Sequence, residues 1–465
     1  MTTLIPEAAR PITFAASGSP EYAEATAAFN LLPRVAPDGA LVARSTAEVV
    51  AAVHAARRSG RGLVPHTTGH AAGGLADLTG ALLVRTAIDA PVRIDAARRR
   101  AVIPAGARWG DVVAAAAPHG LAAAHGSSAT VGAIGYLLRG GMSFYGRERG
   151  LASNGVRSIT LVTAAGEVVT ASAEHEPELF WALRGGGGGF GVVVELEVDL
   201  FPMWRVVTGM TAWDAADAAR VAPLWREWIA RAPRRATTSL RLMNLPPLPG
   251  VPEVLTGRQI LMLDGAVSAA KPDDLAAAQA AADALLGPLS CAAEPILDTW
   301  HVGPPTDLPL THSDPVDPIP SLSDHVLVDA GEGFVADWIA AAGPGSGSRL
   351  LTAELRQLGG AFAEPSGRGG ALDRLDADLA SFAAAVPMPG YDPDAVRADL
   401  ARLRGALSRH DTGFTAPTFV EDVDAPHRAL TEETQARVDA IRRRVDPDGL
   451  FARDVVRPRE AAPRA

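Results

Sequence analysis

Five consecutive glycines at residues 185–189 constrain the fold of this chain more than any other feature. They follow an apolar segment, residues 179–183, and precede residues 192–198, in which apolar and polar side chains alternate. Alternation with a period of two predicts a strand. In a dinucleotide-binding Rossmann unit the glycines instead follow a strand and open a helix whose N-terminus holds the pyrophosphate. A nicotinamide Rossmann site is therefore not supported.

The glycine run itself has two interpretations. A flexible linker is disfavoured, because the preceding residues Leu179, Phe180 and Trp181 are too apolar for one. Glycine allows the backbone to pass close to a flat ligand, and it also allows a tight structural turn. We favour the close approach to a ligand and keep the turn as the alternative.

The first 200 residues predict a mixed α+β domain. Ser45-Thr46-Ala47-Glu48 is a capping-box pattern that opens a helix ending near Gly60. The apolar segment 62–65 then enters a small-residue loop at 66–74. Further short strands and one helix are predicted at residues 40–43, 81–84, 100–103 and 109–119.

Beyond Pro202 the pattern changes to alanine-rich helical segments, proline-rich connections and scattered strands. This change indicates a second domain that extends to about Asp411. A further helix at residues 431–445 carries Val438 and Ile441 on one face and precedes Asp446.

Composition excludes several kinds of chemistry. Cys291 is the only cysteine, which rules out an intramolecular disulfide, a CxxC redox pair and a cysteine-based metal site. Lys271 is the only lysine, and its place before Pro272 argues against a Schiff base or a phosphate loop ending in Gly-Lys. The net charge of −10 argues against nucleic acid or an anionic membrane as partner. A small molecule is the expected ligand, and no metal is expected.

The sequence also predicts a location. No stretch of about 18 consecutive apolar residues is present, so no membrane span is expected. The first residues lack a basic segment followed by an apolar one, so no secretory signal is expected. We therefore expect the protein in the cytoplasm.

Two loops, residues 66–74 and 126–141, are rich in small residues and in backbone N–H groups. Such loops can cradle phosphate groups without positive side chains. They can equally form ordinary turns, and His70 in the first loop can be a simple hydrogen-bonded histidine. A phosphate-bearing cofactor is the functional interpretation.

Taken in order, these motifs resemble a known family. They are similar to the FAD-linked oxidases of the vanillyl-alcohol oxidase superfamily, closest to its berberine-bridge-enzyme-like branch. The resemblance covers residues 29–202 and returns near Leu351 and Asp446. It is carried by Thr68-Gly69-His70, Ala105-Gly106-Ala107-Arg108-Trp109-Gly110, Ala129-Thr130-Val131-Gly132, Gly150-Leu151-Ala152-Ser153-Asn154, Glu354-Leu355-Arg356-Gln357-Leu358-Gly359-Gly360-Ala361 and residues 179–191 and 446–451.

The resemblance implies an α+β fold with a two-part PCMH-type FAD-binding domain. A substrate domain with an antiparallel sheet flanked by helices would cover the flavin. The implied boundaries are 1–203 for the FAD-binding domain, 204–412 for the substrate domain, and 413–465 for a C-terminal segment that returns to the first domain.

The resemblance also implies the cofactor site. His70 matches the histidine that is bonded to the flavin 8α carbon, where a neutral imidazole is a competent nucleophile. Many relatives add a second bond from a cysteine, but that position is Ser128 here, so one covalent attachment is expected. The other implied cofactor-binding residues are His66, Thr67, Thr68, Gly69, Ala71, Thr130, Val131, Gly132, Gly135, Tyr136, Gly140, Gly141, Gly191 and Val192.

This chain departs from the family pattern at several positions. His66 stands where an arginine is usual, Arg139 replaces the first glycine of a Gly-Gly-Gly run, and Gly189 replaces an asparagine. The two phenols that assist deprotonation in relatives correspond to residues 416–418 and Met142, so both are absent.

The family reaction needs a base, so another residue would have to serve. On the predicted strand 352–358, Glu354 and Arg356 share one face, while Leu355 and Gln357 share the other. We predict that the Gln357 face looks toward the flavin and that Glu354 and Arg356 form a solvated pair. The catalytic candidates are Gln357 and Tyr136, and spacing does not rank the others, Tyr145, Tyr391, His312 and His325.

The resemblance thus implies a covalent FAD-dependent oxidoreductase. It would transfer hydride from a small or medium organic substrate to flavin N5 and then reduce dioxygen, and a role in secondary metabolism is the family expectation. The alternatives are a dehydrogenase with another electron acceptor and a non-redox protein, such as a cyclase or binding protein, on the same flavin scaffold. The sequence does not predict an oligomeric state.

Overall fold

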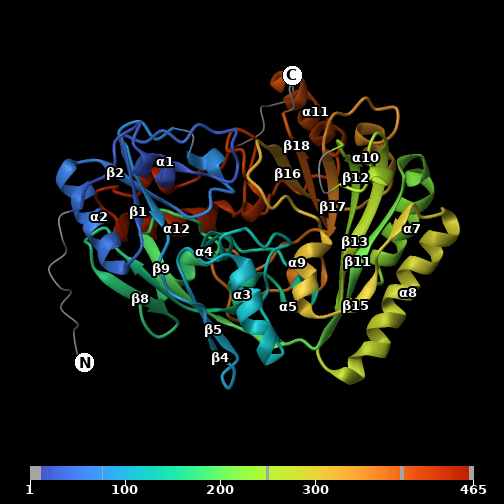
Figure 1. Ribbon diagram of the computed structural model, residues 1–465, viewed down its shortest axis with the longest axis horizontal. Helices are drawn as coiled ribbons and strands as arrows, with labels where there is room; N and C mark the ends of the chain where they lie inside the picture. Colours follow the sequence, from blue (N-terminus) through green and yellow to red (C-terminus); the bar gives the residue numbers. More distant parts are fainter. Residues whose placement is uncertain (1–11, 76, 248–250, 388–391, 460–465) are drawn as a thin grey trace.

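The computed structural model describes residues 12–75, 77–247, 251–387 and 392–459 (Figure 1). Its N-terminal part contains a small parallel sheet of three strands in the order β1-β3-β2. The strands are β1 (Gly39–Ala43), β2 (Gly62–His66) and β3 (Ala81–Thr86). Helix α2 (Thr46–Ser59) begins where Ser45 accepts a hydrogen bond from Glu48 N at 3.3 Å and ends at Gly60 in the left-handed conformation, as predicted.

A second sheet has five strands in the order β4-β5-β9-β7-β8, and every pair in it is antiparallel. Strand β9 (Val192–Asp199) directly follows the glycine run and alternates between buried and half-buried side chains over its second half, which confirms the predicted strand. The other strands are β4 (Arg93–Asp95), β5 (Arg100–Pro104), β7 (Val156–Val162) and β8 (Val168–Ser172).

Short helices connect these sheets. They are α1 (Pro20–Thr26), α3 (Trp109–Ala116), α4 (Ala133–Leu138), α5 (Gly146–Arg149) and α6 (Pro177–Leu183). Helix α3 lies within the predicted range 109–119, whose last residues form a 3-10 turn, Ala117–His119. Trp109 is fully buried in the core beneath the second sheet.

The large sheet of the second domain is antiparallel, with the order β14-β11-β13-β12-β17-β18-β16, and β15 pairs with β11. The predicted α+β architecture is therefore confirmed. Its strands are β11 (Arg205–Asp214), β12 (Ala236–Asn244), β13 (Gln259–Ala269), β14 (Leu297–Asp298), β15 (His301–Gly303), β16 (Leu322–Val328), β17 (Thr352–Gln357) and β18 (Leu379–Ala385).

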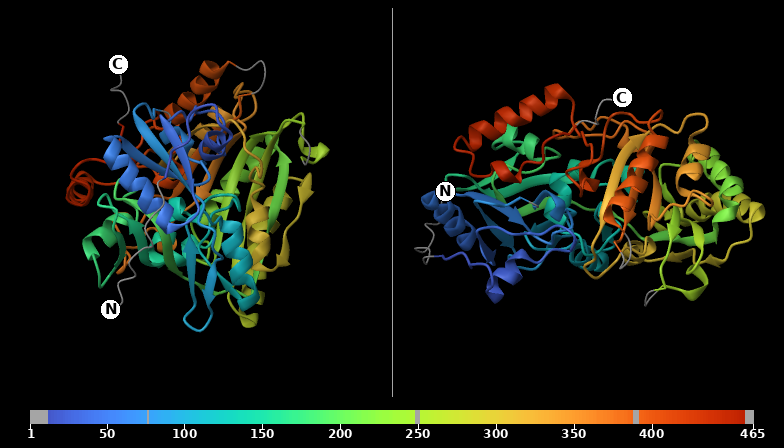
Figure 2. Two further views of the ribbon diagram at one scale, coloured as in Figure 1. Left: turned by 60° about the vertical axis from the view of Figure 1, so that its left-hand side comes forward. Right: turned by 90° about the horizontal axis from the view of Figure 1, so that it is seen from above.

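Helices cover one face of the large sheet (Figure 1). They are α7 (Ala218–Ile229), α8 (Leu275–Ala292), α10 (Phe334–Ala342) and α11 (Pro393–Ala406). Between these helices and the sheet lies a core that includes Trp213, Trp225 and Trp338. The other face of the sheet looks toward the N-terminal domain, and Figure 2 shows the two parts side by side along the long axis.

One helical stretch in the described part of the chain, Pro272–Ala292, is long and apolar enough to cross a membrane by length and composition alone. Only 22% of its most apolar window is buried. Ala278, Ala282, Leu285 and Leu289 form its buried face in the core of the large sheet. A single helix of this kind is weak evidence for a membrane span, because core helices of other proteins have the same properties.

The C-terminal residues return to the N-terminal domain. Helix α12 (Glu432–Val445), which Thr431 caps, lies where the sequence predicts it, and Figure 2 shows it alongside the N-terminal half. Leu63 N in β2 donates to Leu450 O at 2.8 Å. Arg442 Nε donates to Gly188 O at 2.9 Å, so the glycine run is held partly by this segment. The exact domain boundaries stay predictions.

Candidate functional site

A cavity of about 1520 Å³ lies between the N-terminal domain and the uncovered face of the large sheet. On one side are residues 66–71, which follow β2, and residues 126–132, which precede α4; we call these two segments the loop wall. On the other side are cavity-facing residues of β12, β17 and β18, which we call the sheet wall: Arg241, Met243, Thr352, Glu354, Arg356, Phe382 and Ala384.

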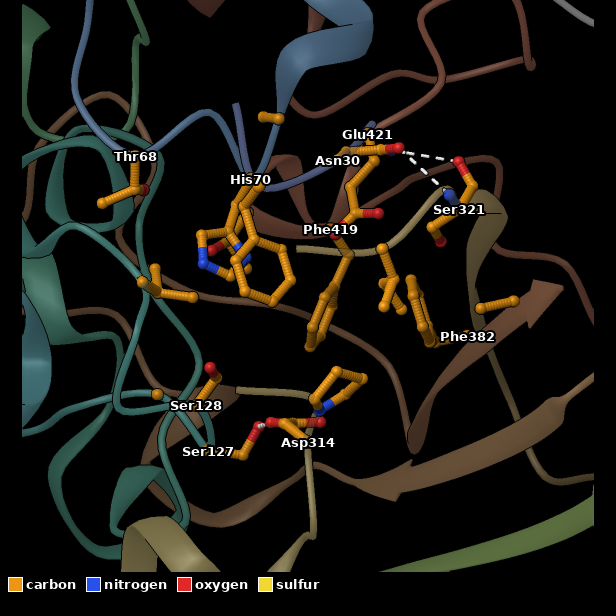
Figure 3. A pocket seen from close by; sticks show the side chains of 18 of the residues that line it. Asn30, Thr68, His70, Ser127, Ser128, Asp314, Ser321, Phe382, Phe419 and Glu421 are labelled. Atoms are coloured by element: carbon orange, nitrogen blue, oxygen red, sulfur yellow. Dashed lines mark hydrogen bonds between the residues drawn. The ribbon is translucent and has the colours of Figure 1, made fainter. Parts of the chain in front are cut away.

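His70 lies on the loop wall in a largely apolar setting (Figure 3). Its ring is stacked on Phe29, with the two centroids 3.8 Å apart and 13° between the planes. Its Nε2 lies 3.1 Å from the hydroxyl oxygen of Thr130. Burial lowers the pKa of His70 to about 4, so the imidazole is neutral at physiological pH.

Hydrogen bonds fix the two loops of the loop wall against each other. Gly132 N donates to Thr68 Oγ1 at 3.3 Å, and the hydroxyls of Thr67 and Thr86 are 2.8 Å apart. His66 Nε2 contacts Ala25 O at 2.7 Å, and burial lowers the pKa of His66 to about 4 as well. The loop wall is thus a neutral surface built mainly from small residues.

Most residues predicted to bind a cofactor line this cavity. They are His66, Thr67, Thr68, Gly69, His70, Ala71, Ser128, Val131, Gly132, Gly135, Tyr136 and Gly191. Thr130 does not line it but contacts His70. The predicted cofactor-binding roles of all these residues stay predictions.

Three predicted residues lie behind the cavity surface instead. Val192 is fully buried in the core of the N-terminal domain. Gly140 and Gly141 accept hydrogen bonds from Ser153 N and Ala152 N, and both have positive φ. A Cβ at Gly141 would come within 2.3 Å of the Tyr136 ring, so this glycine makes room for the tyrosine. Direct contact of these three residues with a ligand of the cavity is therefore not supported.

Two serines of the loop wall have different partners. Ser128 Oγ lies 2.9 Å from Thr130 Oγ1, the hydroxyl that also contacts His70. Ser127 Oγ donates to Asp314 Oδ2 at 2.6 Å across the cavity (Figure 3). A serine–carboxylate bond thus joins the loop wall to the segment that follows α9 (Leu308–Thr311).

The predicted orientation of β17 is wrong. Glu354 and Arg356 line the cavity, and Gln357 does not. The Gln357 amide oxygen instead accepts hydrogen bonds from Thr238 N and Oγ1, both at 3.2 Å, and its nitrogen donates to Ile229 O on the helix side. The Gln357 side chain thus joins the sheet to α7 through hydrogen bonds. Leu355 lies on the same face of β17 as Gln357 and is buried in the core between the large sheet and the helices.

The predicted solvent exposure of Glu354 and Arg356 is also wrong, since their side chains are only 2% and 6% exposed. Arg356 Nε donates to Glu354 Oε1 at 2.7 Å, and Ser239 Oγ donates to the same oxygen at 2.8 Å. Despite burial, the charges of Arg356 and His312 hold the pKa of Glu354 well below its usual range. Buried charges are retained when they are paired in this way.

His312 extends this charged cluster. Its Nδ1 lies 3.0 Å from Asp264 Oδ1, and its Nε2 lies 3.1 Å from Arg356 Nη2 and 3.5 Å from Glu354 Oε2. Asp264 also pairs with Arg241. Burial and Arg241 lower the pKa of His312, but Asp264, Glu354 and Asp314 outweigh them and raise it to about 9. The sequence placed His312 among the unranked candidates, and the structure places it beside the cavity.

Tyr136 lines the cavity, and its buried hydroxyl has no hydrogen-bond partner among the described residues. Burial raises the pKa of this phenol, so it stays protonated. Tyr145 lies deeper, with its ring edge-on to His125 and Phe201. Burial lowers the pKa of His325 to about 3, and its Nδ1 contacts Ser381 O at 2.8 Å. Tyr391 lies outside the described residues.

Several residues in the cavity wall or directly behind it were not predicted from the sequence. Arg241 stands in the apolar run Leu240-Arg241-Leu242, and Asp264 follows an apolar run in β13; a lone charge in such a strand was a usable signal. Phe419 directly follows residues 416–418, which were compared with the family pattern only for their missing phenol. Asp314, Phe382 and Glu421 lie in segments without any motif, and nothing local in the sequence distinguished them.

The cavity fits a large planar cofactor together with a second small molecule. Pockets for one small ligand usually measure about 300–1,000 Å³, and this cavity is larger. A Cβ at Gly135, which lines the cavity, would meet nothing within 4 Å, so α4 presents bare backbone there. The unpartnered polar atoms His66 Nδ1 and Tyr136 Oη are available to a ligand.

Comparisons with known proteins agree with this fit. Residues 37–172 match the family model described as FAD binding domain. The chain is 39% identical over 176 residues to (R)-6-hydroxynicotine oxidase of Paenarthrobacter nicotinovorans, over 37% of this chain and 38% of that protein. It is 32% identical over 204 residues to the FAD-linked oxidoreductase pytB of Aspergillus terreus, over 44% of this chain and 25% of that protein. The chain thus matches well under half the length of these relatives.

Solved structures share the fold of this chain over nearly its whole length. The structure of BBE-like 1 from Physcomitrella patens superposes with a TM-score of 0.80 at 21% identity, covering 94% of this chain and 95% of that one. At this identity the superposition shows a shared fold. The resemblance seen in the sequence motifs is confirmed by the domain match and by this shared fold.

Proposed function

From an FAD binding domain set within the fold of the berberine-bridge-enzyme-like proteins, we infer that this chain is an FAD-dependent oxidoreductase. We propose that it oxidises a small or medium organic substrate and passes the electrons to dioxygen. The relatives named (R)-6-hydroxynicotine oxidase and FAD-linked oxidoreductase support the class of reaction. A bound FAD would supply the hydride acceptor.

One observation carries this proposal: the neutral His70 on the loop wall faces a polar sheet wall across a cavity large enough for two molecules. The loop wall offers small residues and backbone groups for the cofactor. The sheet wall and the segment around Asp314 offer charged and aromatic side chains for a substrate. Enclosure between the two walls would keep water away from the reacting atoms.

We propose His70 as the residue that attaches the flavin covalently. Its low pKa keeps a nitrogen lone pair free, and the Phe29 stack and the Thr130 contact fix the orientation of its ring. Ser128 lies nearby, but its hydroxyl contacts Thr130 and is a far weaker nucleophile than a thiolate. We therefore propose a single attachment.

The purified protein tests the cofactor proposal directly. We expect a yellow protein whose flavin absorbance stays in the pellet after acid precipitation. In His70→Ala the flavin should move to the supernatant, whereas His119→Ala, an exposed histidine outside the cavity, should behave as the wild type. A colourless protein that takes up no added FAD would contradict the proposal and favour a non-redox role.

Activity is tested by anaerobic mixing of the yellow protein with trial substrates. Bleaching of the flavin would support redox chemistry. Hydrogen peroxide formed on admitting air would support an oxidase, and stable bleaching in air would support a dehydrogenase with another acceptor. A flavin that is bleached by dithionite but by no organic substrate tried would favour the non-redox alternative.

A further inference from the structure

One carboxyl group of the cavity, Glu421, lies outside a cluster of paired charges. Three carboxylates, Asp264, Glu354 and Asp314, lie beside three cations, Arg241, Arg356 and His312. Glu421 is a fourth carboxyl group that lines the same cavity. The cations of this cluster pair with its three carboxylates, and no ion pair among the described residues joins one of these cations to Glu421.

Glu421 has few partners of its own. Ser323 Oγ donates to Glu421 Oε2 at 3.3 Å, and no cation of the described residues lies within 4 Å of its carboxyl oxygens. Burial is the main cause that raises the pKa of Glu421 to about 7, and Asp314 adds to it. A nearby cation would oppose both effects, because it favours the charged form of a carboxyl group.

Aromatic rings frame the space that Glu421 faces. Figure 3 shows Glu421 reaching into the cavity between His70 and Phe382, with Phe419 beside it and Asp314 on the far side. The rings of Phe382 and Phe419 lie 5.3 Å apart, centroid to centroid, at 38°. Carboxylates combined with aromatic faces recognise organic cations, since the ring faces also attract positive charge.

A separate observation also indicates a ligand here. The Tyr136 hydroxyl is buried without a partner in the described part of the chain, and the residue, only 8% exposed, lines the same cavity. A buried polar atom without a partner is costly unless a ligand or water satisfies it. A ligand with a polar group as well as a positive charge would satisfy both Tyr136 and Glu421.

We propose that the substrate of this cavity carries a protonated amine and that Glu421, with Asp314 opposite, is the carboxylate that selects it. This inference rests on the proposed function, because it names the substrate class of the same cavity. The amine would supply a positive partner for Glu421, and its hydrocarbon portion would pack against Phe382 and against the part of the Phe419 ring that Arg356, 5.1 Å from the ring centroid, does not cover. A neutral alcohol of the same size would leave Glu421 without a positive partner.

The pH dependence of binding follows from the groups that surround Glu421. Ser323 lies on β16, Asp314 follows α9, His70 follows β2, and Glu354 and Arg356 lie on β17. Burial keeps His70 neutral above pH 5, and the buried ion pair keeps Glu354 and Arg356 charged. Glu421 has a pKa of about 7, and burial raises the pKa of Asp454, which also lines the cavity, to about 6.

Calorimetric titration of the protein as purified tests the proposal with two probes of matched size, benzylamine and benzyl alcohol. Between pH 6 and pH 8 the ionised fraction of a group with a pKa of about 7 rises about tenfold. We therefore expect benzylamine to bind about tenfold more tightly at pH 8, and benzyl alcohol to bind more weakly than benzylamine at both pH values without a pH effect.

Glu421→Gln should remove the pH dependence and weaken benzylamine binding at pH 8 at least tenfold. Glu364→Gln, which alters an exposed carboxylate far from the cavity, should leave binding unchanged. Flavin content and thermal unfolding show whether each variant is folded. If Glu421→Gln does not fold, the titrations of the wild-type protein with benzylamine and benzyl alcohol test the proposal by themselves.

Equal, pH-independent binding of the two probes would overturn the proposal, as would unchanged amine binding in Glu421→Gln. Because calorimetry needs no flavin signal, these outcomes are distinct from failure of the proposed function. A yellow protein without amine preference would retain the function and reject the substrate class. A protein that binds no FAD but still selects benzylamine through Glu421 would reject the proposed function and retain the substrate class.

Discussion

The imidazole of His70 is stacked face to face on the phenyl ring of Phe29, with the centroids 3.8 Å apart. Phe29 belongs to the segment between α1 and β1, and it donates its backbone N–H to Thr68 O at 2.9 Å. The residue therefore contacts both the backbone and the ring of the histidine loop. A ring held on one face presents only its edge and its other face to a ligand.

Phe29→Leu should slow covalent flavin attachment through His70. Stacked aromatic pairs contribute about 0.5–1.5 kcal/mol, which corresponds to a roughly 2–10-fold effect on attachment. The measurement is the fraction of flavin released by acid after a fixed time with FAD. Phe14→Leu, at a partly buried ring outside the cavity, is the matched control. Equal release from both variants would show that stacking does not orient His70.

Gly69→Ala should disturb the loop wall. Gly69 has a φ of +71°, and a Cβ there would lie 2.5 Å from the Cβ of Ala28. Gly80 has a similar φ of +76° with nothing within 4 Å, so Gly80→Ala measures the backbone strain alone, about 1–2 kcal/mol. We expect Gly69→Ala to lower the free energy of unfolding further than Gly80→Ala and to reduce flavin content. Similar losses would mean that Ala28 moves aside freely.

Glu354→Gln should destabilise the protein by about 3–5 kcal/mol, because it leaves Arg356 buried without its carboxylate. Glu364→Gln breaks an exposed pair with Arg234 and should change the stability far less, because solvent screens that pair. Urea unfolding of the two variants gives the comparison. A small effect of Glu354→Gln would indicate that Asp264 and Asp314 together neutralise Arg356.

Stability should fall as the pH rises from about 7 to 9 because of His312. Its pKa is raised from 6.5 to about 9 in the folded protein, so its contribution is complete below pH 6.5 and is lost through pH 9. At about 1.4 kcal/mol per pKa unit, the loss is of the order of 3 kcal/mol. Glu421 has a raised pKa as well, but its effect ends near pH 7.

Thermal unfolding in this pH range checks the prediction. His312→Gln should flatten the slope, whereas His119→Gln, at an exposed histidine outside the cavity, should retain it. A wild-type protein with constant stability across the range would show that His312 Nε2 accepts a hydrogen bond from Arg356 and that the ring is neutral.

Local patterns predicted the local structure well. The capping box at Ser45, the apolar face of residues 431–445 and the alternation after Gly191 each predicted an element that the structure contains, because each pattern depends on residues close together in the sequence. The loop that carries His70 could be located in the same way, because its small residues gather in one short segment directly after a strand.

The sheet wall could not be predicted in the same way. Alternation on β17 separates Glu354 and Arg356 from Leu355 and Gln357, but it does not say which face meets the helices. A pair of opposite charges on one strand face suggests solvent exposure, because the neutralising partners Asp264 and His312 are far away in the sequence. Glu421 had no local signal at all, since its environment comes from Ser323 and Asp314.

The walls of the cavity come from both ends of the chain, and this has a consequence during protein synthesis. Phe419, Glu421 and Asp454 line the cavity together with residues that leave the ribosome almost 400 positions earlier. The loop wall can therefore form on the nascent chain, but the compartment closes only after the last segment has been translated. A chain that stops near residue 420 would contain both the loop wall and the sheet wall, but it would lack Glu421 and Asp454 from the lining of the cavity.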